Sequence, residues 1–178
     1  MSVTLGLAIT LSVSYEISSE KLIVKYTVVN QCKQSIYLFD KAYKATQEGV
    51  APRDDYLLVS LEPPDTAVVA SKLLPVPPGT AFATPLTALG TLVKAGETFR
   101  GTASAPLPLK LDGTTSATKE FVCRRVRFEL GYVVDVAELA AKPTNLKQVF
   151  ELTRAAWNKQ AVLKTEPREM TIQGLIAK

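Results

Sequence analysis

The segment VCRRVRFELGYVV, residues 122–134, is the longest strand pattern in the chain and decides its fold class. Its apolar side chains recur at every second position, which is typical of a strand with one buried face. The pattern predicts that Val126–Val134 buries this face, while Arg125 and Arg127 lie on the outward face. Cys123 shares the outward register and is therefore predicted to point away from the core.

The N-terminal part of the chain repeats this alternation twice. Val3–Tyr15 and Leu22–Val28 each place apolar side chains at every second position, and Ser18–Glu20 connects them. The two segments are predicted to form a hairpin. Val3–Val13 lacks the basic start and the helical period of a signal peptide, and no run approaches the roughly 20 apolar residues that span a bilayer. We therefore expect no membrane span and a cytoplasmic location.

Five shorter runs of strand character follow, separated by turn residues. They are Ile36–Phe39, Tyr56–Leu61, Ala67–Leu74, Leu89–Lys94 and Glu97–Ala105. Glu62–Asp65 contains two prolines, and Ala95-Gly96 is a further turn signal. Asp40–Asp55 shows weak periodicity and is predicted to be a long loop. The prolines of Pro75–Pro85 predict a long connection within one domain.

The C-terminal region carries a different pattern. After Pro143, apolar side chains recur at three- and four-residue steps up to Trp157, which predicts a short amphipathic helix. Lys147–Thr153 also fits a strand, because two of its apolar residues flank a glutamate. Gln160–Lys164 and Met170–Ile176 are predicted to be closing strands.

Together these patterns predict an all-β fold in a single domain, residues 1–178. Short strands between proline and glycine turns are typical of an antiparallel β-sandwich, here of seven to nine strands with one short C-terminal helix. We expect an immunoglobulin-like architecture only in a loose sense. Cys32 lies in a polar break and Trp157 follows both cysteines, so the disulfide pattern of antibody domains is absent. Reduced thiols at Cys32 and Cys123 are favoured over one disulfide.

The 178 residues include no histidine, which removes most routes to acid–base and zinc chemistry. No glycine-rich phosphate loop or hydrolase nucleophile motif is present either. Acidic loop residues could supply calcium ligands or a catalytic carboxylate pair, but their spacing does not match a calcium-binding loop. The sequence therefore predicts a protein that is not an enzyme and that holds no cofactor or metal.

The net charge of +4 is spread along the chain, with 21 basic and 17 acidic residues. The densest basic run, Lys119–Arg127, lies at the start of the strand quoted above and is interpreted as a solvated strand face. A polyanion-binding stripe is the alternative, but the run lacks the row of interleaved aromatic residues of a stacking surface. We expect no nucleic-acid binding.

The function that remains is a non-catalytic protein-interaction module, in which loops of a rigid sandwich contact a protein partner. The candidate partner-binding residues lie in the two long connections and are Asp40, Tyr43, Asp54, Asp55, Pro77, Pro78 and Phe82. The alternative is a module that binds a small molecule or carbohydrate. Such a module would need exposed aromatic side chains, for which Tyr43 and Phe82 are candidates.

Overall fold

The computed structural model describes residues 9–53, 57–74, 76, 87–111 and 119–176, and this part of the chain is mostly β. Its first half contains β1 (Ile9–Ile17), β2 (Lys21–Asn30), β3 (Ile36–Leu38), β4 (Ala42–Thr46), β5 (Gly49–Arg53), β6 (Leu58–Glu62), β7 (Thr66–Ser71) and β8 (Ala88–Val93). Its second half contains β9 (Thr98–Pro106), β10 (Leu109–Lys110), β11 (Lys119–Val134), β12 (Lys142–Pro143), β13 (Val149–Leu152), β14 (Ala161–Lys164) and β15 (Arg168–Ile176). A 3-10 turn, η1 (Ala137–Leu139), and one short helix, α1 (Ala155–Lys159), complete it. The all-β expectation is confirmed, whereas the fifteen strands among the described residues exceed the seven to nine expected.

Three strands form a small antiparallel sheet in the order β1-β2-β9. β1 pairs with β2 without interruption, from Ile9 opposite Asn30 to Ile17 opposite Leu22. This confirms the predicted N-terminal hairpin within the described residues. The inward face of β2 consists of the buried residues Leu22, Val24, Tyr26 and Val28. The apolar alternation in the sequence is thus also an alternation of burial, because a strand turns successive side chains to opposite faces.

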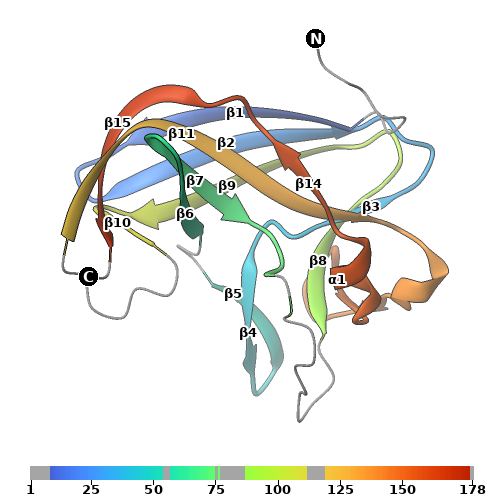
Figure 1. Cartoon of the computed structure of the whole chain (residues 1–178). Coiled ribbons are helices and arrows are strands. Elements are labelled where there is room, and N and C mark those ends of the chain that lie inside the picture. Colours follow the sequence, from blue (N-terminus) through green and yellow to red (C-terminus); the bar gives the residue numbers. More distant parts are fainter. Residues whose placement is uncertain (1–8, 54–56, 75, 77–86, 112–118, 177–178) are drawn as a thin grey trace.

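The large sheet is mixed rather than wholly antiparallel. Ten strands belong to it, and β11 pairs with β15 and β14 and with β3 and β7. β7 runs parallel to β11, and β10 runs parallel to β15. In Figure 1, β11 crosses the molecule as the long orange strand. The antiparallel expectation therefore holds for most pairings but not for these two.

The main core lies between the two sheets. Phe128 is fully buried in the middle of β11, and its ring centroid lies 5.2 Å from that of Tyr26 on β2. A second, smaller core lies on the opposite face of the large sheet, where residues of η1 and α1 pack with Tyr37 and Val133. The centre of the large sheet is therefore buried on both faces.

An irregularity in β11 overturns the predicted position of Cys123. The pairing with β15 shifts register between Cys123 and Arg125, as in a β-bulge, so the alternation of faces slips by one residue there. Cys123 is 1% exposed and belongs to the main core, while Val122 is 57% exposed. A bulge leaves no mark in a pattern of period two, so the prediction was wrong at this point. Neither Cys32 nor Cys123 is in a disulfide.

Two other segments also differ from expectation. Asp40–Asp55 is not one long loop, because β4 and β5 pair as an antiparallel hairpin that closes with Thr46 opposite Gly49. The expected helix is limited to the five residues of α1, and β13 is a strand that pairs with β8. The strand alternative for this segment is confirmed, since pairing with a neighbouring strand overrides a helical period this short.

Candidate functional site

The β4–β5 hairpin forms a two-stranded sheet that is separate from both larger sheets. Figure 1 shows it projecting downward, to the left of β8. Its residues Lys44–Gly49, which include both turn residues, are exposed. Exposed connections on a rigid scaffold are where binding residues usually lie, so this hairpin is the candidate functional element.

A chain of polar side chains ties the base of the hairpin to the large sheet. Asp40, just before β4, is 3% exposed and accepts a hydrogen bond of 2.5 Å from the Thr91 hydroxyl on β8. The Tyr43 hydroxyl lies 3.4 Å from the same Thr91 oxygen. Because the Thr91 proton points to Asp40, Tyr43 is the donor in this second contact. The first residues of β4 pair with β5, and this side-chain contact ties them to the large sheet.

Burial sets the protonation of this cluster. It raises the pKa of the Asp40 carboxyl, while the hydrogen bond from Thr91 and the charge of Lys41 lower it. Burial and the charge of Asp40 raise the pKa of Tyr43 to about 12. Burial, with the charges of Asp40 and Tyr43, raises the pKa of Tyr26 far above its ordinary value. Both tyrosines therefore keep their protons at neutral pH, which suits a structural anchor.

Asn145, in the connection between β12 and β13, holds the far end of the hairpin. Its Oδ1 accepts a hydrogen bond of 2.9 Å from the Val50 N–H, and its Nδ2 donates one of 3.0 Å to the Val50 carbonyl. Gly49 permits this approach, because a Cβ there would lie 2.5 Å from Asn145 Oδ1. Its φ of +128° is also a conformation that glycine tolerates. An element fixed in this way loses less conformational entropy when it binds.

Of the seven residues proposed from the sequence, the structure describes two, Asp40 and Tyr43, and brings them together around Thr91. Asp40 is buried, so it supports the hairpin and is not itself available for a surface contact. The other five, Asp54, Asp55, Pro77, Pro78 and Phe82, lie outside the described residues. Sequence reasoning missed Thr91 and Asn145. Thr91 lies within an ordinary strand pattern, and Asn145 lies in the segment after Pro143 for which the sequence predicts a helix.

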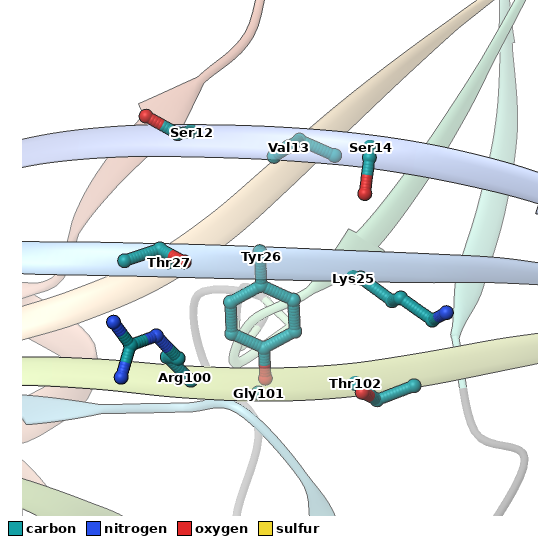
Figure 2. Close-up of a pocket in the computed structure, with 9 residues that line it drawn as sticks. All are labelled: Ser12, Val13, Ser14, Lys25, Tyr26, Thr27, Arg100, Gly101 and Thr102. Atoms are coloured by element: carbon teal, nitrogen blue, oxygen red, sulfur yellow. The ribbon is translucent and has the colours of Figure 1, made fainter.

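The outer face of the small sheet carries a groove of about 480 Å³. Figure 2 shows that it crosses β1, β2 and β9. The Tyr26 ring belongs to the buried inward face of β2 and lies over Gly101. A Cβ at Gly101 would lie 2.3 Å from this ring, so only glycine fits where the ring passes β9. Lys25 is paired with Glu16 at 2.5 Å, which leaves Arg100 and four hydroxyl groups to line the groove. Exposed groups of this kind are screened by water and hold a ligand weakly.

A smaller cleft of about 330 Å³ lies beside α1. Half-buried Trp157 lines it together with the polar side chains of Arg154, Asn158 and Gln160. The Gln160 amide is already engaged, since it accepts from the Leu73 N–H at 2.8 Å and donates to the Leu73 carbonyl at 3.1 Å. An aromatic side chain beside a few fixed polar groups is a common arrangement in small-ligand sites.

The outward face of β11 contains a buried carboxylate where a solvated face was predicted. Glu129 is 3% exposed, and its oxygens lie 2.5 Å from Lys72 Nζ, 2.9 Å from an Arg127 nitrogen and 3.5 Å from Lys164 Nζ. Arg127 also pairs with Glu62 at 2.6 Å. Burial opposes the charge on Glu129, but Lys72 foremost, with Lys164 and Arg127, lowers its pKa. The prediction of a solvated face is therefore wrong at Arg127, which is committed to two ion pairs.

No cluster of three or more His, Cys, Asp or Glu side chains in the described part of the chain is placed to hold a metal ion. No helix there is long and apolar enough to cross a membrane. Comparison of the chain with protein-family profiles, curated proteins and solved structures finds no match. The function is therefore inferred from the geometry of the β4–β5 hairpin, of the groove on the small sheet and of the cleft beside α1.

Proposed function

We propose that the protein is a non-catalytic interaction module that contacts a protein partner through the β4–β5 hairpin. The observation that carries this proposal is the fixation of an exposed element at both ends. The chain from Asp40 through Thr91 to Tyr43 holds its base, and Asn145 holds its far end. The described residues of β4 and β5 belong to neither core cluster. A defined shape for recognition explains why an element outside the core is anchored twice.

Capture of the partner from the native host tests the proposal. The unaltered full chain, Asn145→Ala and Thr102→Ala are immobilised, and the proteins that each retains are identified and quantified. Thr102 lies on the outer face of the small sheet and gives a surface control outside the hairpin. We expect a stoichiometric partner that Thr102→Ala retains and that Asn145→Ala retains about tenfold less well, a loss of about 1.4 kcal/mol. Equal retention by all three forms, or no retained partner, would contradict the proposal.

A small-molecule or carbohydrate ligand is the second candidate, and the Trp157 cleft favours it. The aromatic side chain and its polar neighbours form the kind of lining that such ligands use. Screening of the full chain against soluble sugars would then give binding that Trp157→Ala abolishes and Asn145→Ala leaves unchanged. The reverse dependence, or no binding, would remove this candidate.

We make two further inferences, one about how the two larger sheets are arranged and one about the compartment in which the protein lies. We infer a loosely immunoglobulin-like sandwich because residues of both sheets enclose one core, although the parallel pairing of β7 with β11 departs from an antiparallel sandwich. We infer a reducing compartment such as the cytoplasm because Cys32 and Cys123 are present as separate thiols.

A further inference from the structure

The two edges of the β4–β5 hairpin differ in what they offer to another strand. On β5, the N–H and C=O of Val50 are both bonded to Asn145, and Pro52 has no N–H to donate. The outer edge of β5 is therefore closed. No described strand pairs with the outer edge of β4.

The register of the hairpin shows which backbone groups lie on that outer edge. In an antiparallel pair, opposed residues alternate between those that bond to each other and those whose N–H and C=O point away from the partner strand. Val50 points away from β4 toward Asn145 and lies opposite Ala45, so Ala45 points away from β5. Tyr43, which lies opposite Pro52, shares this orientation. These two residues therefore direct two N–H and two C=O groups outward, without a backbone partner among the described residues.

We propose that the outer edge of β4 takes up an extended acidic segment of a partner protein as an added antiparallel strand. This inference rests on the proposed function and specifies how the hairpin binds. The outward groups of Tyr43 and Ala45 supply the backbone hydrogen bonds, as when an extended peptide adds to an exposed sheet edge. The hairpin is already fixed at both ends, so little additional ordering opposes the pairing.

Lys44 determines the chemistry of the partner segment. It lies between the two outward-pointing residues, is exposed, and has no ion pair among the described residues. An added strand would set one of its residues opposite Lys44 at a non-hydrogen-bonded position, where opposed side chains approach most closely. A carboxylate at that position is the complementary group.

A second copy of the chain is a poorer occupant of the same edge. Two β4 strands related by a two-fold axis run antiparallel, and pairing Tyr43 of one with Ala45 of the other sets Lys44 opposite Lys44. Directly opposed like charges are destabilising. Residues 41–53 also contain three basic residues and one acid, Glu48, so this segment is better matched by an acidic strand than by itself.

Titration of the full chain, labelled with ¹⁵N, tests the inference. One probe is a short synthetic peptide in which valine alternates with glutamate, and the second has lysine in place of each glutamate. We expect the glutamate peptide to slow amide hydrogen exchange at Tyr43 and Ala45 and to bind at least about tenfold more tightly than the lysine peptide. Lys44→Glu should reverse this preference.

Two proline positions supply a matched pair of variants. Ala45→Pro removes one outward N–H and leaves the pairing with β5 in place, so it should weaken the glutamate peptide about tenfold. Pro52→Ala alters the closed edge and should leave the affinity unchanged. The amide chemical shifts of β11 report whether each variant is folded. If Ala45→Pro distorts the hairpin, the peptide preference of Lys44→Glu tests the inference instead.

Three outcomes would overturn the inference. The first is equal binding of the two peptides, and the second is unchanged exchange at Tyr43 and Ala45 with millimolar glutamate peptide. The third is protection of both amides that rises with protein concentration alone, which would assign the edge to a second copy. The proposed function is tested separately with the native partner. If Asn145→Ala loses this partner while Lys44→Glu and Ala45→Pro retain it, the hairpin is still the interface. That result would contradict strand addition alone.

Discussion

The β1–β2 and β4–β5 hairpins are both antiparallel pairs, but they are held in place by different means. β2 buries Leu22, Val24 and Val28 completely in the main core, so removal of apolar surface from water fixes it. The described residues of β4 and β5 belong to neither core cluster, and hydrogen bonds to Thr91 and Asn145 fix that hairpin. An element held by few polar contacts can open without unfolding the rest. The molecule thus separates the part that gives stability from the part that we propose is presented to a partner.

The largest effect is expected in the main core. Phe128→Ala should lower the free energy of unfolding by about 3–5 kcal/mol, because it removes a fully buried ring and leaves a cavity beside Tyr26. Val122→Ala, at a position that is 57% exposed on the same strand, should cost less than about 0.5 kcal/mol. Denaturant unfolding of both variants measures the difference. Equal small losses would mean that β11 is not central to the core.

The ionic cluster on β11 should give the next largest effect. Glu129→Gln removes the charge shared by Lys72, Arg127 and Lys164. Breaking a buried ion pair costs roughly 3–5 kcal/mol, and the partial exposure of both lysines reduces this to about 2 kcal/mol. Glu151→Gln, an exposed acid on β13, is the control and should change stability by less than about 0.5 kcal/mol.

The Glu129 contribution should also depend on pH. Because the folded state lowers the pKa of this carboxyl below its ordinary value of 4.5, its contribution is complete above that value. It is lost as the pH falls through the lower folded pKa. The stability difference between the unaltered protein and Glu129→Gln, measured by denaturant unfolding, should be constant near neutral pH and shrink in acid. A difference that stays constant in strong acid would contradict this account.

Release of the hairpin should have a smaller effect on global stability. Asn145→Ala removes two hydrogen bonds that are largely exposed to water, so the free energy of unfolding should fall by about 1 kcal/mol or less. Exchange at the Val50 amide should accelerate in this variant, while amides of β2 keep their protection. Acceleration of equal size in β2 and at Val50 would mean that the hairpin and the core unfold together.

The smallest effect is expected at the Tyr26 hydroxyl. This group is buried and has no hydrogen-bond partner among the described residues. Tyr26→Phe should therefore be neutral or stabilising, by up to about 1 kcal/mol, because it removes an unsatisfied polar group and keeps the ring over Gly101. Thermal unfolding of the variant checks this. A loss above about 1 kcal/mol would show that the hydroxyl has a stabilising contact, for example through an ordered water near Asp40.

The accuracy of sequence-based prediction differs between these regions for a physical reason. The inner faces of β1, β2 and β11 from Val126 onward all pack against the main core, so their apolar side chains recur with the period of a strand. The β4–β5 hairpin packs into neither core, so it has no apolar stripe, and the sequence predicted a loop. Cys123 was assigned to the wrong face because a bulge changes register without changing composition.

The candidate site was predictable only in part. Asp40 and Tyr43 were named because they lie in a long connection between strands. Their partner Thr91 lies 51 positions from Asp40, and Asn145 lies 95 positions from Val50. Contacts over such separations are set by the pairing of β8 and β13 in the large sheet, which no local pattern indicates.

Amide hydrogen exchange of the unaltered full chain, at a concentration where it is monomeric, tests the central claim most directly. The Val50 N–H is bonded to Asn145, whereas the N–H groups of Tyr43 and Ala45 point outward from β4. The account predicts slow exchange at Val50 and fast exchange at Tyr43 and Ala45, within one small hairpin. Protection of Tyr43 and Ala45 equal to that of Val50 would show that both edges are closed, and it would contradict the claim that β4 is presented to a partner.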